Sequence, residues 1–493
     1  MAAQPLFSVD HDRIQPATDT TTPINAQHAQ GKLTAGERIE LLLDAGSCTE
    51  LGMRDQHSGS QGDDGVITVH GTINGRPVCV FAKDISVGEG TLGTRHGAKI
   101  CRLQELALES RIPIIGLFDS AGMRLEAGMD GLSAYGAIAK NCALSSGLIP
   151  QIALVCGPCR GADALLPPLF DLVFMTKTHS SLFVTAPDIV AAVTGEQVDA
   201  DKLGGWDAHT KKSSIAHGAF DNDVLAIRQI RRLVGLLPST YGSSAPARVC
   251  HDQPEREAPA LDTLLPQDGS GAYDIKEALL QISDDREFFE LQAEFAQNLV
   301  IGLAGMGGKT VGMVANQPRT LAGVLDRDAT RKAARFVRFC NTFDLPVVSF
   351  VDAPGFLPGV AEEQGGLATY VADLLRAYAQ ASVPLVTVVV RKAYGAAGVA
   401  MGSRAIGADL VYSWPDTQIG MMGAKGATAL IPEGQPRPDP AAYVKETLAP
   451  EAVAASGGID DIIAPRQTRR HIIRALGLLA HKCTQHRHHR SAL

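Results

Sequence analysis

Short apolar runs alternate with amphipathic stretches along most of the chain. The runs are rich in β-branched residues and cover 113–118 (PIIGLF), 151–155 (QIALV), 346–351 (PVVSFV) and 385–390 (LVTVVV). Apolar residues recur at helical spacing over 98–110, 329–343 and 367–380. Continuous apolar strands that alternate with amphipathic helices indicate a buried, largely parallel sheet. The pattern therefore predicts an α/β fold.

The same pattern occurs twice in nearly one register. IPIIGLFDSAG resembles LPVVSFVDAPG, which places Asp119 opposite Asp352. Downstream, GLIPQIALVCGPCRGAD resembles ASVPLVTVVVRKAYGAA, which places Gly161 opposite Gly395 at almost the same offset. Solenoid repeats have units of about 20–50 residues. Copies that lie almost half the chain apart are therefore duplicated domains.

We expect two domains, 1–245 and 260–493, joined by the Pro- and Ser-containing stretch 239–262. In layered α/β domains, the loops that leave the carboxyl ends of strands form the binding site. Three pairs of loops occupy such positions in the two copies: DSAGMRLEAG with DAPGFLPGV, CGPCRGADA with RKAYGAAGV, and VTAPDIV with GMMGAKGAT.

Composition and charge narrow the function classes. The 493 residues carry a formal net charge of −8 and a pI near 6.0, which argues against nucleic acid as the main partner. No apolar run approaches the length of about 18 residues that a membrane span needs, so we expect none. The segment 1–23 does not read as a signal peptide. Nine scattered cysteines favour buried thiols in a reducing cytoplasm.

The tetrapeptide Cys156-Gly-Pro-Cys159 has the spacing of a redox dithiol. The duplicate copy argues against that chemistry, because Val390 and Ala393 stand where the two cysteines would be. Both copies keep a turn of small residues instead. Such a turn, opening a helix after a strand, leaves backbone N–H groups free to hold an oxyanion. Alternatively, the small residues only allow close packing of helix and strand.

Other motifs in the sequence give weaker indications of function. GLAGMGGKT (302–310) ends like a phosphate-binding loop, but Leu303 stands where the first glycine would be. We interpret this segment, and its duplicate GTINGRPV (71–78), as hairpin turns. The sequence has neither an H-E-x-x-H motif nor paired CxxC motifs, so we expect no metal in this chain.

The chain resembles the carboxyltransferase (β) subunit of biotin-dependent acyl-CoA carboxylases, of the propionyl-CoA carboxylase type. The resemblance is carried by GDDGVITVHGTINGRPV, ANQPRTLAGVLDRDATRKAARFVRFCNTFDLPVV, VDAPGFLPGVAEEQGG, VRKAYGAAG and MMGAKGA. It implies two crotonase-like domains of the ClpP/crotonase superfamily, the first on the acyl-CoA side and the second on the biotin side. It also implies a homo-hexamer.

The resemblance implies chemistry without a side-chain nucleophile. A partner subunit with biotin carboxylase and a biotin carboxyl carrier protein would deliver carboxybiotin. The carboxyl group would pass to the α-carbon of an acyl-CoA thioester through an enolate. Gly161 and Ala162 would hold the enolate, and Ala396 and Ala397 would hold the biotin carbonyl. Further contacts with biotin are expected from Gly395, Phe356 and Leu357.

This sequence departs from the family at the first turn. The family reads Cys-Ala-Gly-Gly-Ala where this chain has Cys159-Arg160-Gly161-Ala162-Asp163, so two charges flank the turn. Arg160 and Asp163 either pair with each other, or Arg160 recognises a carboxylate or phosphate of an unusual substrate. We expect altered acyl specificity, because Val399 stands where the family has its acyl-specificity residue. The residues expected to contact the acyl-CoA are Arg124, Arg160, Asp163 and Val399.

Three interpretations of function follow. The first is a carboxyltransferase component with altered acyl specificity. The second is a decarboxylase of a malonyl- or methylmalonyl-type thioester, or related enolate chemistry, without biotin. The third is an inactive structural subunit of a mixed hexamer.

Overall fold

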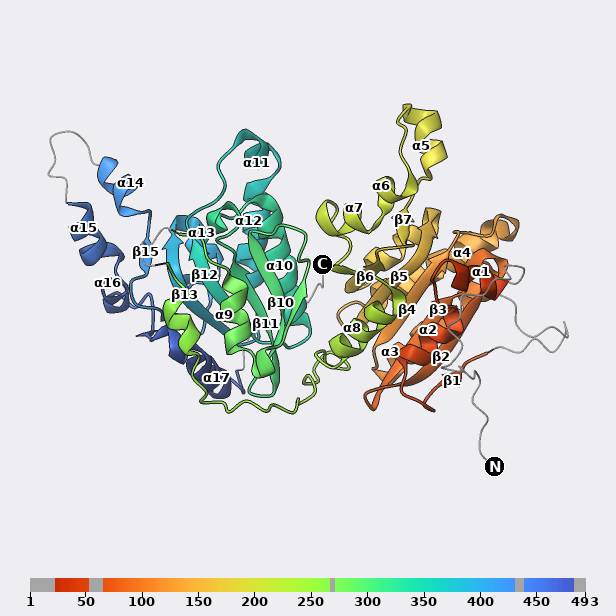
Figure 1. The fold of residues 1–493 in the computed structure, drawn as a ribbon, viewed down its shortest axis with the longest axis horizontal. Coiled ribbons are helices and arrows are strands. Elements are labelled where there is room, and N and C mark those ends of the chain that lie inside the picture. Colours follow the sequence, from red (N-terminus) through yellow and green to blue (C-terminus); the bar gives the residue numbers. More distant parts are fainter. Residues whose placement is uncertain (1–22, 53–64, 267–270, 431–438, 483–493) are drawn as a thin grey trace. The chain divides into compact units, whose positions relative to one another are not determined.

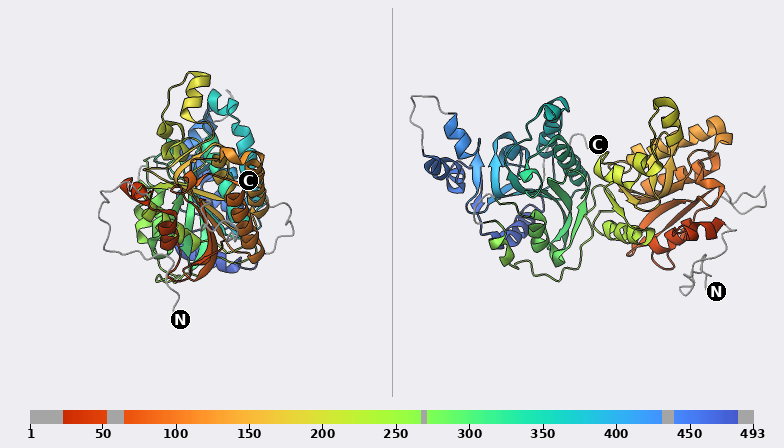
Figure 2. Two further views of the ribbon diagram at one scale, coloured as in Figure 1. Left: turned by 90° about the vertical axis from the view of Figure 1, so that its right-hand side faces the viewer. Right: turned by 45° about the horizontal axis from the view of Figure 1, so that its top comes forward.

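The computed structural model describes residues 23–52, 65–266, 271–430 and 439–482. The chain divides into two compact units, Met1–Ser243 and Ser244–Leu493. Positions 239–258 contain turns and bends but no helix or strand. Each unit contains its own eight-stranded sheet with helices packed on it, as Figure 1 and the further views of Figure 2 show.

The sheet of the first unit has the order β1-β2-β3-β4-β5-β6-β8, and β7 pairs with the end of β5. Strands from β3 to β8 pair in parallel, whereas β1, β2 and β3 are antiparallel. The strands are β1 Thr49–Glu50, β2 Val66–Ile73, β3 Arg76–Lys83, β4 Ile114–Ser120, β5 Gln151–Arg160, β6 Leu172–Thr176, β7 Ser181–Phe183 and β8 Gly218–Phe220. The helices are α1 Pro23–Ala29, α2 Ala35–Leu42, α3 Thr94–Ser110, α4 Gly128–Ser145, α5 Pro187–Thr194, α6 Ala200–Gly204, α7 Trp206–Lys211 and α8 Asp223–Val234.

The second unit repeats this arrangement with the order β16-β14-β13-β12-β11-β10-β9, and β15 pairs with the end of β13. Its strands are β9 Phe288–Leu291, β10 Leu299–Met306, β11 Lys309–Asn316, β12 Val347–Ala353, β13 Leu385–Tyr394, β14 Leu410–Ser413, β15 Gln418–Gly420 and β16 Asp461–Ile462. Its helices are α9 Ile275–Ile282, α10 Arg327–Thr342, α11 Val360–Gln364, α12 Leu367–Ala379, α13 Gly395–Ala400, α14 Ala424–Ala429, α15 Pro440–Tyr443, α16 Pro450–Ala455 and α17 Thr468–Leu478.

The two sheets match in detail. The register between β4 and β5 shifts between Phe118 and Ser120, and that between β12 and β13 shifts between Val351 and Ala353. These are duplicate positions in the two copies of the sequence. The segments β2/β3 and β10/β11 are antiparallel hairpins, which confirms the hairpin interpretation and rules out a phosphate-binding loop.

Burial explains why the apolar runs form the central strands. Every residue of β4 and of β12 is buried, as a strand covered on both faces requires. Helices α3 and α10 turn their apolar stripes towards the sheets, and each also buries one lysine, Lys99 in α3 and Lys332 in α10. Across the described ranges, no helix is both long and apolar enough to cross a membrane.

Candidate active site

The first small-residue turn lies at the carboxyl end of β5. The strand ends at Arg160, and a 3₁₀ turn, Gly161–Leu165, follows at once. Gly161 has φ +65°, a left-handed conformation that disfavours any side chain. Crowding is not the reason for glycine, because an added Cβ would meet no atom within 4 Å. Since the first N–H groups of a helical turn have no partner within it, this turn can offer them to an oxyanion.

The second unit has the same turn at the carboxyl end of β13. Gly395 begins α13 with φ +55°, and an added Cβ would lie 3.1 Å from the carbonyl oxygen of Met421. Ala396 is exposed and Ala397 is buried. Val399, one helical turn further on, is 38% exposed. Both small-residue turns thus lie where the sequence placed them, each within its own unit, and their role as oxyanion holes stays a prediction.

In each unit a neighbouring loop runs beside the turn. In the first unit, Gly122 lies so close to β5 that an added Cβ would be 3.0 Å from the carbonyl oxygen of Arg160. The next residue, Met123, forms a parallel bridge with Leu92. The side chain of Arg124 turns along the loop 88–93, where its Nε lies 3.4 Å from Thr91 Oγ1.

The corresponding loop of the second unit holds the two expected biotin contacts. Phe356 forms a parallel bridge with Leu325, which duplicates the bridge in the first unit. Leu357 donates its N–H to the carbonyl oxygen of Leu325 at 2.8 Å. Both side chains are half-buried, so each leaves apolar surface beside the strand ends.

Arg160 and Asp163 differ sharply in environment. Arg160 is exposed, and its Cζ lies 5.6 Å from the ring centroid of Phe183, its register partner on β7. Asp163 is fully buried, and its Oδ1 accepts a hydrogen bond from Nζ of the equally buried Lys83 at 2.5 Å. The interpretation in which Arg160 and Asp163 pair with each other is therefore wrong. No anionic partner of Arg160 occurs among the residues that the structure describes.

The two cysteines of the CxxC motif lie inside β5 and have no exposed surface. Burial raises the pKa of both thiols well above its usual range, which opposes thiolate formation. The Cys159 thiol lies 3.4 Å from the carbonyl oxygen of Asp163, the acceptor of its hydrogen bond. The second cysteine thus helps to hold the turn.

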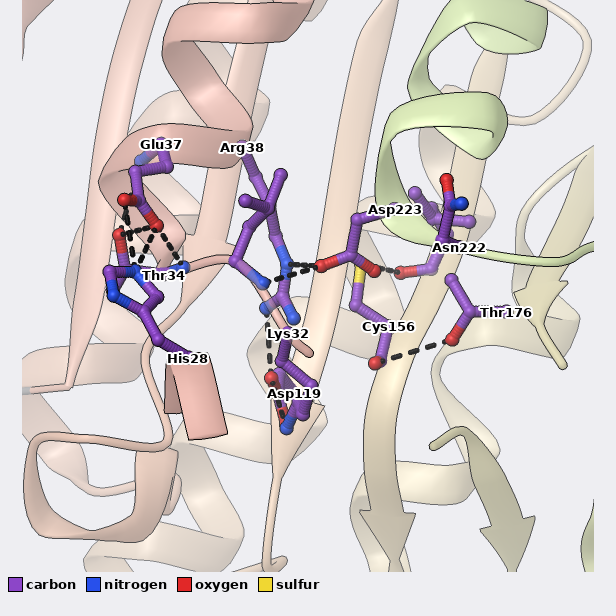
Figure 3. A network of polar contacts seen from close by, with 12 residues as sticks. His28, Lys32, Thr34, Glu37, Arg38, Asp119, Cys156, Thr176, Asn222 and Asp223 are labelled. Atoms are coloured by element: carbon purple, nitrogen blue, oxygen red, sulfur yellow. Dashed lines mark hydrogen bonds and ion pairs between the residues drawn. The ribbon is translucent and has the colours of Figure 1, made fainter. Parts of the chain in front are cut away.

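Behind the loop that follows β4, a chain of ion pairs is buried (Figure 3). Asp119 accepts hydrogen bonds from Lys32 Nζ at 2.9 Å and from Arg38 Nη1 at 2.8 Å. The Nε of Arg38 donates to Asp223, the first residue of α8, at 2.8 Å. The segment from α1 to α2 therefore fastens the end of β4 to the rest of the unit.

The second unit holds the duplicate aspartate differently. Asp352 accepts hydrogen bonds from Arg391 Nε at 2.9 Å and from the Tyr273 hydroxyl at 3.0 Å. Burial and the neighbouring Asp352 raise the pKa of Tyr273, so this hydroxyl stays protonated and continues to donate. Both aspartates are buried at the end of the strand that precedes the site.

Sequence reasoning missed Lys32, Arg38 and Lys83. Lys83 gave a signal, since it is a lone cation at the end of the apolar run VCVFAK, but nothing local indicated its partner. Among the described residues, no three His, Cys, Asp or Glu side chains gather as metal ligands would.

Residues 26–492 match the model of the carboxyl transferase domain family. The chain belongs to this family. A propionyl-CoA carboxylase beta chain of Roseobacter denitrificans is 45% identical over 480 residues, covering 94% of this chain and 93% of that protein. The methylmalonyl-CoA decarboxylase subunit alpha of Veillonella parvula is 42% identical, covering 93% and 92%.

A solved structure has the same fold as this carboxyltransferase. It is the transcarboxylase 12S hexamer with methylmalonyl-CoA and methylmalonic acid bound. The TM-score is 0.90 at 38% identity, over 94% of this chain and 92% of that one. The duplicated crotonase-like fold expected from the sequence is thereby confirmed.

Proposed function

We propose that this carboxyltransferase moves a carboxyl group between carboxybiotin and the α-carbon of an acyl-CoA. The observation that carries the proposal is the pair of left-handed glycines, Gly161 and Gly395, each opening a turn at the carboxyl end of a central strand. The site requires no side-chain nucleophile, because the chemistry depends on stabilising oxyanions. Backbone donors that are fixed before the reaction supply that stabilisation.

On the acyl-CoA side, the amides of Gly161 and Ala162 bind the thioester oxygen. They hold it more strongly as negative charge develops during removal of the α-proton, which lowers the barrier. Gly122 packs on the carbonyl of Arg160 and so keeps the preceding residue in place. Side-chain replacement leaves backbone donors intact, so only changes in the path of the turn will disturb them.

On the biotin side, the amides of Ala396 and Ala397 bind the ureido carbonyl. Biotin bound there would supply the carboxyl group and a base for the α-proton. The residues present fit such a ring. Gly395 has no side chain to occupy the space beside the carbonyl oxygen of Met421, where a Cβ would lie at 3.1 Å. Phe356 and Leu357 offer half-buried apolar surface in the adjoining loop.

Residues of both units contribute to specificity for the acyl-CoA. Arg160 binds a carboxylate or phosphate of the substrate, since it is exposed and its guanidinium is oriented by the Phe183 ring. Arg124 shapes the adjoining loop through Thr91. Val399 presents an exposed apolar side chain where the acyl group is selected. Asp163, being buried, acts from behind the turn.

This chain contributes the transferase step of a larger system. A separate carrier protein brings biotin, and a partner subunit with biotin carboxylase recharges it. The protein assembles as a homo-hexamer in the cytoplasm. The likeness to the 12S hexamer supports the assembly.

A second candidate function is decarboxylation of a malonyl- or methylmalonyl-type thioester. The 42% identity to a methylmalonyl-CoA decarboxylase subunit favours it. It uses the same enolate turn but needs no biotin, because the carboxyl group leaves as carbon dioxide and the enolate is protonated.

The test is incubation of the purified chain with malonyl-CoA and methylmalonyl-CoA, with and without free biotin, followed by mass spectrometry of the thioesters. Biotin-stimulated loss supports the transferase. Equal loss without biotin supports the decarboxylase. Loss of neither thioester, together with failure to bind any acyl-CoA, would overturn both and leave a structural subunit.

A further inference from the structure

A buried ion pair lies directly behind the first oxyanion turn. Lys83 is the last residue of β3, and Asp163 is the third residue of the turn that Gly161 opens. Neither side chain has any exposed surface. The contact therefore joins the end of a strand to the turn across 80 positions of sequence.

Asp163 is held through its backbone as well as its side chain. Its carbonyl oxygen accepts hydrogen bonds from Leu166 N at 3.2 Å and from the Cys159 thiol at 3.4 Å. The residue next to Ala162 is thus fixed from three directions. Any displacement of Asp163 would move the two amides that immediately precede it.

The duplicate turn has no such pair. Asn316 occupies the position of Lys83 at the end of β11, and Ala397 occupies that of Asp163. Asn316 accepts from Asp352 N at 3.2 Å and donates to the carbonyl oxygen of Gly323 at 2.9 Å. The turn of the second unit is an α-helix, whereas that of the first is a 3₁₀ turn. The charged pair thus accompanies the tighter winding of the acyl-side turn.

We infer that Lys83 is a positioning residue for the acyl-side oxyanion hole, acting through Asp163. The expected effect of Lys83 on the reaction rate rests on the proposed function, whereas the anchoring of Asp163 by Lys83 does not depend on that function. Buried charges are expensive unless each has its partner. Removing one partner forces the other to move towards water or to lose its charge, and the turn moves with it.

The duplicate supplies a variant that should fold. Lys83→Asn with Asp163→Ala installs the side chains found at the second turn and leaves no buried charge unpaired. An asparagine side chain at position 83 could accept from the N–H of Asp119 and donate to the carbonyl oxygen of Gly90. These two groups correspond to Asp352 N and Gly323 O, the partners of Asn316. Asp163→Asn is the conservative variant, because its amide oxygen can still accept from Lys83. Arg469→Met is the control, because it breaks another buried ion pair, with Asp284 in the second unit.

Two readouts separate anchoring from function. The first is amide hydrogen exchange of the segment 160–169, which needs no turnover. The second is kcat and KM for carboxyl transfer. The double variant should exchange the Leu166 amide faster and lose about 100-fold in kcat, the scale of a misplacement of about 1 Å, with KM and melting temperature little changed. Asp163→Asn should retain more of kcat, and Arg469→Met should lower the melting temperature alone.

Unchanged exchange and unchanged kcat in the double variant would overturn the inference. If the double variant does not fold, Asp163→Asn is compared with Asp163→Ala by amide exchange and by kcat. Equal exchange rates and equal kcat values in these two variants would overturn the inference. A wild-type chain without transfer activity would contradict the proposed function, whereas faster exchange in the variant would still support the anchor.

Discussion

Gly157 lies where any side chain would collide with Asp119. A Cβ added to this glycine would be 2.0 Å from Asp119 Oδ1 and 2.8 Å from Lys32 Nζ. The duplicate of Gly157 is Arg391, whose guanidinium itself binds the duplicate aspartate, Asp352. In the second unit the cation that binds the aspartate is Arg391, on the adjacent strand β13. In the first unit Gly157 of β5 leaves room for cations from the N-terminal segment, Lys32 and Arg38.

Gly157→Ala should therefore destabilise the first unit. The methyl group must displace two members of a fully buried ion-pair chain, and overpacking of this kind lowers the free energy of unfolding by about 1–3 kcal/mol. Chemical denaturation measures the loss. Gly136→Ala is the matched control, because Gly136 lies in α4 with no atom within 4 Å of an added Cβ. A loss no larger than that of the control would contradict the account.

Two glycine-to-alanine variants distinguish backbone strain at the first turn from loss of its oxyanion-binding amides. Gly161→Ala places a side chain at φ +65°, which should lower the free energy of unfolding by about 1–2 kcal/mol. It should also lower kcat more than it raises KM, since the amides shift. Gly457→Ala introduces similar strain at φ +76°, again with open space around the Cβ, and should leave kcat unchanged. Equal kcat values for both variants would argue against an oxyanion hole at Gly161.

Arg160→Gln should raise KM for the acyl-CoA about tenfold with little change in kcat. A charge-assisted hydrogen bond is worth about 1.5–3 kcal/mol, and its loss weakens ground-state and transition-state binding alike. Steady-state kinetics at several ionic strengths measures both constants. The exposed Arg102 of α3 supplies the control, Arg102→Gln. An unchanged KM in Arg160→Gln would remove Arg160 from the substrate site.

Two aspartates at equivalent places in the two sheets should differ in what their replacement does to stability. Asp171 accepts from Gln151 N at 2.8 Å and Asp409 accepts from Leu385 N at 2.7 Å, but Asp409 also binds Lys482. Burial raises the pKa of Asp171 from 3.8 to about 7. The folded state therefore holds a proton that the unfolded state releases, so this stabilising contribution is complete below about pH 4 and is lost as pH rises to about 7.

Asp171→Asn cannot lose a proton and keeps an oxygen for Gln151. Its free energy of unfolding relative to wild type should increase between about pH 4 and pH 7 and then level off. Asp409→Asn should instead be less stable than wild type at pH 7, because Lys482 loses its ion partner. Denaturation at a series of pH values tests both. A flat difference for Asp171→Asn would show that its carboxyl group is ionised throughout this range.

The sequence was sufficient for the features that repeat locally. The duplication predicted the strands, both hairpins and the positions of the turns, because alternation of apolar runs and small residues is a property of adjacent positions. The pairing of the buried charges could not be predicted from the sequence. Lys83 and Asp163 are 80 positions apart, and only the parallel order β3-β4-β5 brings their elements together. Pairing of Arg160 with Asp163, one of two alternatives that their proximity in sequence suggested, does not occur, because Arg160 ends β5 with its side chain exposed whereas Asp163 is buried in the turn that follows.

Transfer of a labelled carboxyl group from methylmalonyl-CoA to free biotin tests the central claim most directly. The account predicts label in carboxybiotin, formed at a rate that falls in Gly161→Ala and is retained in Gly457→Ala. Label that appears only as carbon dioxide, at a rate indifferent to biotin, would contradict carboxyl transfer by this chain.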